Sequence, residues 1–501
     1  MGDDGVLNLE RTTIGKLQKQ YAVSGLTARA VTEAYLKRIK KLNEDLNALC
    51  AISEDALSQA EELDRYRDEH DGALKGPLHG IPMVIKDQIE TAGMVTAFGS
   101  KTAEKYVPER DATVVQKLKH AGAVIIGKSM MPDWAASWFS TSSLSGTAKN
   151  PFDYTRDPGG SSSGTGAAVA GSLAVAGIGG DTGGSIRLPS SFCNLVGVRC
   201  TPGRISRDGM SSLVATQDTP GPMTNNVEDA ALILDAIVGF DPRDEYTYIN
   251  NLVPPPSFLS AISNYSLTGK SFGVIRSAFG THPGVLSVMD NTLSRLVAAG
   301  ATLIDISIPD LDRLKIFTSV YYTRSKSDIN AFLSARSSPD LPSSFDAVHA
   351  SGIYHSALDL IDVIASGPSD PFTEPEFAAR LQVQSQFQRL VGSLFAAHSL
   401  SGILYPTCQL PAPKTKDVLE GKWTCLDYPT NTIIASQLCF PAVSVPVGWC
   451  RDEEITGHVE WKGIQLPVGL EILGLPLGEE GLLAAAKGIE DVMKAMRVPD
   501  V

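Results

Sequence analysis

The stretch that decides how this chain is interpreted is Gly179-Gly180-Asp181-Thr182-Gly183-Gly184-Ser185-Ile186-Arg187. Glycines directly before a serine leave backbone N–H groups uncovered, and consecutive amides can then point at one oxygen atom, as an oxyanion hole requires. We therefore predict an oxyanion hole formed by the backbone of Thr182, Gly183, Gly184 and Ser185, which makes Ser185 a candidate nucleophile. Asp181 and Arg187 flank this loop, and we expect them to brace it rather than to touch a substrate.

A serine nucleophile needs a base, and the upstream sequence offers a lysine. Gly76-Pro77-Leu78-His79-Gly80-Ile81-Pro82 predicts a turn that leads into a short apolar strand, Met83-Val84-Ile85, and this strand ends at Lys86. A lysine can serve as the base of a serine if burial removes its charge. Between Lys86 and the glycine-rich loop lie a serine run, Ser161-Ser162-Ser163, and small residues that predict a closely packed helix from Ala167 to Ala176.

Two further motif matches point to other chemistry, and both lack the structural context that this chemistry needs. Gly122 to Ser129 fits the phosphate-loop pattern G-x-x-x-x-G-K-S, but its interior, Ala-Val-Ile-Ile, favours a buried strand and a helix precedes it. Gly160 to Gly164 fits the nucleophile-elbow pattern G-x-S-x-G centred on Ser162, but no strand precedes it and no histidine after it is a convincing triad partner. Nucleotide binding and an elbow at Ser162 are therefore kept as alternatives that experiments can exclude.

A longer series of blocks surrounds these segments, and through it the chain resembles the amidase signature family over nearly its whole length. The most specific block runs from Asp157 to Pro189. It is preceded by Gly76–Pro82 and Lys86-Asp87, and it is followed by Gly203-Arg204-Ile205-Ser206, Asp218-Thr219-Pro220-Gly221-Pro222-Met223, Pro441-Ala442-Val443-Ser444-Val445-Pro446 and Leu466-Pro467-Val468-Gly469-Leu470. So many blocks in one order are not expected by chance.

The resemblance implies a Ser–cis-Ser–Lys triad, in which Lys86 is the base, Ser161 the bridging serine and Ser185 the nucleophile. The separation of the two serines agrees with family members, and it selects Ser161 over Ser162 and Ser163, which composition alone leaves open. Ser162 is then expected to hold Lys86 by a hydrogen bond. No metal ion and no organic cofactor is implied.

Two blocks depart from the family pattern without removing a triad member. Gly197-Val198-Arg199-Cys200-Thr201 stands where the family has Gly-Leu-Lys-Pro-Thr, and Gly127-Lys128-Ser129-Met130 stands where it has Gly-Lys-Thr-Asn. By the resemblance, Ala135 falls at a substrate-contacting position and Met130 lies close to the segment that lines the acyl pocket. Trp134 and Trp138 suggest an apolar or aromatic pocket that borders Ser161. We therefore expect a substrate preference that differs from the well-known amidases.

Helices alternate with short apolar strands, which predicts an α/β fold. The resemblance implies three α/β/α layers around a large mixed sheet. We expect a single domain over residues 1–501, with a catalytic core at about 75–225 and a variable helical substrate-pocket region at about 250–400. C-terminal strands and a helix would complete the sheet, and the strands are predicted at Gly402-Ile403-Leu404, Ala442-Val443-Ser444-Val445 and Pro467-Val468-Gly469-Leu470.

Composition limits the classes of partner. The net charge of −13 at pH 7 and the lack of a clustered basic run argue against nucleic acid as a direct partner. The seven cysteines are scattered without a C-x-x-C pair, which favours free thiols over disulfides or a zinc site. No segment reaches about 18 uninterrupted apolar residues and the N-terminus has no apolar signal, so we expect no membrane span and a cytoplasmic location. A small-molecule amide and water are the expected partners, and a homodimer is compatible with the sequence.

These observations predict a hydrolase of non-peptide C–N bonds in linear amides, acting through a Ser185 acyl-enzyme on a carboxamide or a related acyl or carbamoyl bond. Ser161 and Lys86 would relay the protons. Two alternatives use the same triad: the amidase subunit of a tRNA-dependent amidotransferase, which would pass ammonia to a partner, and an esterase or carbamate hydrolase. A pseudo-enzyme or nucleotide switch resting on Gly122–Ser129 is a third.

Overall fold

A computed structural model of the chain describes residues 7–23, 25–263, 265–451 and 465–501. Within these residues the strands of the main sheet are β1 Leu49–Ile52, β2 Ile81–Lys86, β3 Ala123–Ser129, β6 Ala176–Asp181, β7 Val196–Arg199, β8 Thr219–Thr224, β9 Ser271–Val274, β10 Thr302–Asp305, β11 Leu400–Pro406, β12 Ala442–Cys450 and β13 Leu466–Leu473. A separate hairpin pairs β4 Thr141–Ser142 with β5 Gly146–Thr147.

The described part of the chain forms one 11-stranded mixed sheet in the order β1-β3-β2-β6-β8-β7-β12-β13-β11-β9-β10. β2 lies between β3 and β6 and runs parallel to both, so the strand that carries Lys86 has a hydrogen-bonded neighbour on each side. All residues of β2, β3 and β6 are buried, as expected for parallel strands that helices cover. The sheet thus holds Lys86 at the end of a rigid interior strand.

The helices in chain order are α1 Ile14–Val23, α2 Ala28–Leu46, α3 Ala56–Glu69, α4 Thr113–His120, α5 Ser163–Ala170, α6 Arg187–Phe192, α7 Val227–Ile237, α8 Ile249–Leu252, α9 Phe258–Ile262, α10 Pro283–Ala298, α11 Leu311–Phe317, α12 Tyr321–Ser334, α13 Phe345–Ser351, α14 Asp359–Ser366, α15 Phe377–His398, α16 Thr415–Leu419, α17 Ile433–Leu438 and α18 Glu479–Met493. Short 3₁₀ turns are η1 Lys101–Ala103, η2 Asp133–Ala135, η3 Glu245–Tyr248, η4 Arg276–Ala278 and η5 Pro371–Thr373.

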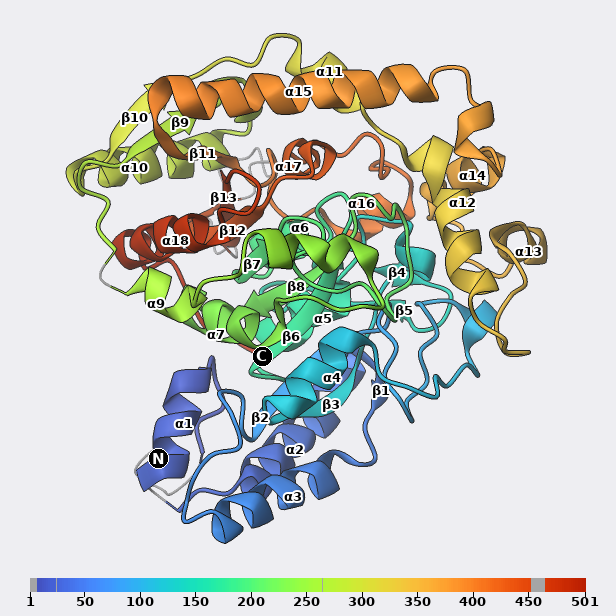
Figure 1. The fold of residues 1–501 in the computed structure, drawn as a ribbon, viewed down its shortest axis with the longest axis vertical. Coiled ribbons are helices and arrows are strands. Elements are labelled where there is room, and N and C mark those ends of the chain that lie inside the picture. Colours follow the sequence, from blue (N-terminus) through green and yellow to red (C-terminus); the bar gives the residue numbers. More distant parts are fainter. Residues whose placement is uncertain (1–6, 24, 264, 452–464) are drawn as a thin grey trace, which may run out of the picture.

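Helices cover both faces of the sheet, which confirms the predicted three-layer α/β/α fold (Figure 1). Side chains of a strand alternate between the two faces. On β12, Val443 and Val445 join the cluster that includes Val288 of α10 and Leu482 of α18. Ala442, one position away, joins a different cluster with residues of α15 and α17. The predicted C-terminal strands at 402–404, 442–445 and 467–470 are confirmed as parts of β11, β12 and β13.

One prediction about secondary structure was wrong, and another was incomplete. The predicted helix at 167–176 is displaced: α5 ends at Ala170, Gly171 and Ser172 follow in a turn with φ 58° at Ser172, and Ala176 begins β6. The region at about 250–400 was predicted as helical; it contains α9 to α15, and it also contains β9 and β10, which form one edge of the sheet. Each of these strands has four residues, the shortest run over which a strand alternation can be recognised.

The state of the cysteines and the character of the helices bear on two further predictions. All seven cysteines are free thiols, as predicted. Across the part of the chain that the structure describes, no helix has the length and apolar character that crossing a membrane requires.

Candidate active site

Lys86, at the C-terminal end of β2, is completely buried and bonded to the serine run. Its Nζ donates to Ser161 Oγ at 2.7 Å and to the carbonyl oxygen of Gly180 at 3.2 Å. Strand β6 brings Gly180 alongside because Ile85 pairs with Ile178 in the sheet register. The strand pairing therefore positions Lys86 next to Ser161.

The environment of Lys86 favours its neutral form. Burial lowers the pKa of Lys86 to about 7, while the carboxylates of Asp181 and Asp218 oppose this shift. An ordinary lysine has a pKa of about 10.4, so the burial of this side chain converts a permanent cation into a group that titrates near neutral pH. A neutral amine with a hydroxyl 2.7 Å away can accept a proton.

Ser161 follows a cis peptide bond to Gly160 and is completely buried. Gly160 packs against the preceding loop so closely that a Cβ would lie 2.6 Å from the carbonyl oxygen of Phe139. The N–H of Ser162 donates to the carbonyl oxygen of Ser185 at 3.1 Å, and this bond ties the serine run to the glycine-rich loop. Within the described residues, the hydroxyls of Ser161 and Ser185 are not hydrogen-bonded to each other.

The glycine-rich loop after β6 presents most, but not all, of the predicted oxyanion donors. The N–H of Gly184 donates to the Asp181 carboxylate at 3.0 Å, so this predicted donor is already in use. The amides of Thr182, Gly183 and Ser185 have no hydrogen-bond acceptor among the described residues. Gly184 has a φ of 125°, a backbone conformation that only glycine adopts readily, and a Cβ there would overlap the Thr432 hydroxyl.

Asp181 and Arg187 are joined to the loop by several hydrogen bonds. The Asp181 carboxylate accepts from Arg187 Nε at 3.0 Å, from Arg199 Nη1 at 2.9 Å and from the N–H of Ile186 at 3.2 Å. Burial alone would raise the pKa of Asp181, but the charges of Arg187 and Arg199 outweigh this effect and hold it below its ordinary value. Arg187 also binds Glu471 of β13, so the loop is anchored to a distant strand.

The hydrogen bond predicted between Ser162 and Lys86 was wrong. Ser162 Oγ accepts from the N–H of Gly180 at 3.2 Å and lies 3.3 Å from its carbonyl oxygen, and it has no bond to Lys86. It occupies the N-cap position of α5, and no strand leads directly into it, so the nucleophile-elbow context is absent among the described residues. Ser162 and Lys86 thus share the Gly180 carbonyl, and Ser162 stabilises the position of β6.

The phosphate-loop match is a buried strand, as its apolar interior predicted. Residues 123–129 are β3, and Lys128 is completely buried. Its Nζ donates to the carbonyl of Ile89 and to Thr96 Oγ1 at 2.7 Å. Burial lowers the pKa of Lys128 to about 8, against the attraction of Asp87. A phosphate could not reach this amine, so nucleotide binding at this segment is excluded.

Of the predicted pocket residues, the structure brings Trp138 to the loop. A Cβ on Gly183 would lie 3.5 Å from Trp138 Nε1. Trp134 instead stacks on Phe98 with ring centroids 5.0 Å apart. Met130 is completely buried, its N–H donates to the carbonyl oxygen of Ala48, and its own carbonyl oxygen accepts from the N–H of Gly164 in the first turn of α5. Ala135, beside Trp134, is 4% exposed, and its contact with a substrate stays a prediction.

Three residues near the loop were not found by sequence reasoning. The Tyr321 hydroxyl, on the first residue of α12, would overlap a Cβ on Gly183. Thr432 Oγ1 donates to the carbonyl of Gly183 at 2.8 Å. Thr182 Oγ1 donates to Asp218, whose pKa burial raises to about 6. Asp218 begins a block that carries the family resemblance, but Tyr321 and Thr432 lie in stretches without a readable motif.

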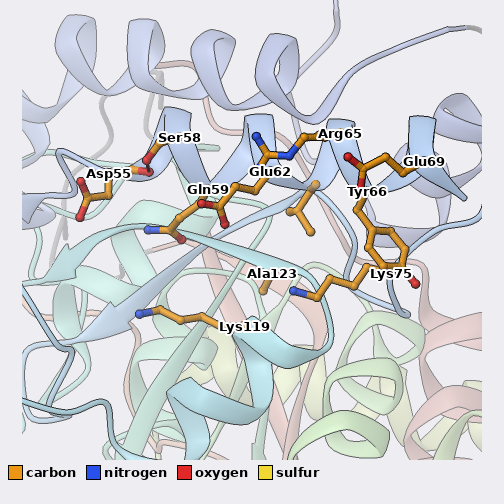
Figure 2. A pocket seen from close by; sticks show the side chains of 11 residues that line it. Asp55, Ser58, Gln59, Glu62, Arg65, Tyr66, Glu69, Lys75, Lys119 and Ala123 are labelled. Carbon is orange, nitrogen blue, oxygen red and sulfur yellow. Dashed lines mark hydrogen bonds between the residues drawn. The ribbon is translucent and has the colours of Figure 1, made fainter.

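A polar surface cavity lies away from these residues. It has a volume of about 640 Å³ and is lined by α3, Lys75, Lys119 and the start of β3. Figure 2 shows both acidic and basic side chains around this cavity. None of the predicted triad residues lines this cavity. We therefore identify the candidate site by the contacts among Lys86, Ser161 and the glycine-rich loop.

The fold and this constellation define a class of enzyme, and comparison with known proteins gives the same class. Residues 30–483 match the family model described as Amidase, and the chain belongs to the amidase family. It is 31% identical to a subunit of the glutamyl-tRNA(Gln) amidotransferase of Thermoanaerobacter pseudethanolicus, over 97% of this chain and 98% of that protein. The corresponding subunit from Geobacter metallireducens is 32% identical over 95% and 96% of the two chains.

Solved structures show the same architecture. The peptide amidase of Stenotrophomonas maltophilia superposes with a TM-score of 0.84 at 29% identity, covering 98% of this chain and 99% of that one. The corresponding glutamyl-tRNA(Gln) amidotransferase subunit of Thermotoga maritima gives a TM-score of 0.76 at 27% identity, covering 99% of each chain. The relatives thus include both a peptide amidase and subunits of an amidotransferase. The chain is an enzyme of a family that acts on C–N bonds.

Proposed function

We propose that this protein hydrolyses linear carboxamides through an acyl-enzyme on Ser185, with Ser161 and Lys86 as the proton relay. The observation that carries the proposal is the 2.7 Å hydrogen bond between Ser161 and a buried lysine whose pKa is lowered to about 7. A glycine-rich loop that ends in Ser185 is tied to the same serine run. These two contacts support the proposal that Lys86, Ser161 and Ser185 act together.

The relay moves two protons in the acylation step. Ser161 takes the proton of Ser185 Oγ and gives its own proton to neutral Lys86, while Ser185 Oγ bonds to the amide carbon. The oxyanion is stabilised by the backbone N–H groups of Thr182, Gly183 and Ser185. Among the described residues, none of these three N–H groups is hydrogen-bonded to another acceptor. Lys86 then returns its proton through Ser161 to the leaving nitrogen, and the C–N bond breaks.

Deacylation repeats the relay with water. Ser161 and Lys86 accept a proton from a water molecule as it attacks the acyl ester, and the proton then passes to Ser185 Oγ as the ester bond breaks. The products are a carboxylic acid and ammonia or an amine. An ester or a carbamate could enter the same cycle, since the triad acts on the carbonyl carbon and the leaving group needs only a proton.

A second function, the ammonia-producing subunit of a tRNA-dependent amidotransferase, is supported by the relatives of that name. The two functions make different demands, because the subunit of an amidotransferase passes its ammonia to a partner, whereas a hydrolase releases it. Purified alone, a hydrolase would turn over simple amides, whereas a transferring subunit would need its partner for full activity.

An amide panel with the purified chain alone tests the proposal. It would contain aliphatic, aryl, fatty and peptide-terminal carboxamides together with glutamine, and ammonia release would be measured. Hydrolysis of at least one simple carboxamide that Ser185→Ala abolishes supports the hydrolase. Turnover of glutamine only, and only after a partner subunit is added, would favour the amidotransferase function instead.

A further inference from the structure

Thr432 holds the glycine-rich loop from a distant part of the chain, 249 residues beyond Gly183. It is completely buried, and its Oγ1 donates to the carbonyl oxygen of Gly183 at 2.8 Å. Thr432 also packs directly on Gly184, where an added Cβ would overlap both the hydroxyl and the Cβ of the threonine. The side chain of Thr432 is therefore in close contact with the loop, and a glycine at position 184 permits this contact.

The peptide between Gly183 and Gly184 is held at both ends. Its carbonyl oxygen accepts from Thr432, and its N–H, which belongs to Gly184, donates to the Asp181 carboxylate at 3.0 Å. Arg187 joins the two holders, because its guanidinium donates to the Asp181 carboxylate at 3.0 Å and to the carbonyl oxygen of Thr432 at 2.9 Å. The plane of this peptide is thus fixed relative to a buried ion pair.

The orientation of this peptide decides where the neighbouring N–H groups point. The N–H of Gly183 belongs to the preceding peptide and the N–H of Ser185 to the following one, and neither has an acceptor among the described residues. Glycine has no Cβ to restrict its backbone, so Gly183 and Gly184 do not by themselves hold these two peptides in one orientation. A bond from outside the loop is needed to keep both donors directed at one oxygen atom.

The hydroxyl of Thr432 makes this bond in place of its usual local role. Thr432 occupies the N-cap position of α17, where a threonine hydroxyl ordinarily accepts from an N–H group of the first turn, but its side chain makes no such capping bond. Its Oγ1 lies 2.9 Å from Thr430 Oγ1. Since the single proton of the Thr432 hydroxyl goes to Gly183, the Thr430 hydroxyl donates to Thr432, and this chain strengthens the bond to the loop.

We propose that Thr432 is a positioning residue of the oxyanion hole, and that its hydroxyl sets the direction of the Gly183 and Ser185 N–H groups by fixing the peptide between Gly183 and Gly184. The proposal rests on the proposed function, because an oxyanion forms only when Ser185 attacks a carbonyl carbon. Thr432 acts through the loop and not by contact with the substrate. Loss of its hydroxyl therefore weakens binding of the transition state and leaves binding of the amide in the ground state unchanged.

Two substitutions at one position, with a matched control, test the proposal. Thr432→Val removes the hydroxyl and keeps the branched shape, whereas Thr432→Ser keeps the hydroxyl. Thr318→Val is the control, because Thr318 is also completely buried and its hydroxyl bonds to Gln437 Oε1 of the same helix α17 at 2.6 Å. Urea unfolding shows that each variant folds, and Thr432→Ala gives the same comparison if the valine variant does not.

Two constants are compared among the variants. The first is kcat, measured together with KM on the carboxamide of the amide panel that wild-type protein hydrolyses fastest. The second is the Ki of the aldehyde with the same acyl group, because the adduct of an aldehyde with Ser185 is tetrahedral and carries the oxyanion. A variant that disturbs only the packing of α17 has no reason to change both constants by the same factor.

Thr432→Val should lower kcat by about 10- to 100-fold with KM within about two-fold, and it should raise the Ki of the aldehyde by a similar factor. Thr432→Ser should keep kcat within about three-fold of wild type, and Thr318→Val within about two-fold. Equal losses in Thr432→Ser and Thr432→Val, a loss that appears in KM instead of kcat, or no loss in Thr432→Val would overturn the inference and leave the proposed function intact. If wild-type protein hydrolyses no amide of the panel, the proposed function fails and the inference falls with it.

Discussion

Removing the amine of Lys86 should abolish both the activity and its dependence on pH. Lys86→Met keeps a side chain of similar length in the buried space but has no base. At pH 7.4 only about one in a thousand free lysines is neutral, whereas more than half of the molecules are neutral when the pKa is about 7. Burial therefore raises the available base by several hundred-fold, and the variant loses this base entirely.

The assay is the pH dependence of kcat/KM between pH 5 and pH 9. Wild-type protein should show one acidic limb with an apparent pKa of about 7, so that the value at pH 6 is about one-tenth of the plateau. Lys86→Met should lose at least about 10³-fold and show no such limb, and Lys86→Arg should not restore activity because a guanidinium stays charged. Near-normal hydrolysis by Lys86→Met with an unchanged pH profile would refute the assignment of the base.

The same burial predicts a change in stability whose sign can be worked out. The folded-state pKa of Lys86 is below its unfolded value, so the unfolded chain binds more protons between pH 7 and about pH 10. The free energy of unfolding must therefore rise with pH across this window. Lowering the pKa of Lys86 from 10.5 to about 7 corresponds to about 5 kcal/mol, and the two hydrogen bonds lost with the amine offset about 2–3 kcal/mol of it. Urea unfolding should show Lys86→Met to be about 2–3 kcal/mol more stable at pH 6, with the advantage disappearing above pH 9.

Three further changes have defined outcomes. Gly183→Ala should lower kcat by more than about ten-fold because its Cβ overlaps the Tyr321 hydroxyl, and Tyr321→Phe in the same chain should recover part of the loss in a double-mutant cycle. Asp218→Asn removes a charge that raises the pKa of Lys86, so the acidic limb of kcat/KM should move to lower pH. Lys128→Ala should destabilise the protein by about 3–5 kcal/mol in urea unfolding, because Asp87 loses its buried counter-charge, while ATP gives wild-type protein no thermal shift; a thermal shift at micromolar ATP would contradict the strand assignment.

The candidate catalytic residues could be predicted from the sequence because the local patterns around them are unusual. The apolar run before Lys86 predicted a buried strand, and the structure places the lysine at its end with a lowered pKa. The interior of the phosphate-loop match predicted a strand for the same reason. Selecting Ser161 within three consecutive serines, however, needed the family resemblance, since the three residues offer the same hydroxyl.

Other features depend on the folded conformation of the chain, which the local sequence pattern does not record. Gly184 was predicted as an oxyanion donor, but the Asp181 carboxylate takes its N–H, and this follows from the fold of the loop. β8 contains Pro220 and Pro222, residues that usually argue against an interior strand, yet it pairs with β6 and β7. Tyr321 reaches the loop from a region without motifs, so only the arrangement of α12 in space reveals it.

The central claim is that Ser185 is the nucleophile, and covalent labelling tests it most directly. A fluorophosphonate probe reacts with an activated serine and leaves an adduct that peptide mapping can locate. We expect one adduct per chain, on Ser185, which at 4% exposure is more accessible than the completely buried Ser161 and Ser162. The adduct should be absent from Ser185→Ala and strongly reduced in Lys86→Met. An adduct on Ser162, or undiminished amide hydrolysis by Ser185→Ala, would contradict the assignment of the nucleophile.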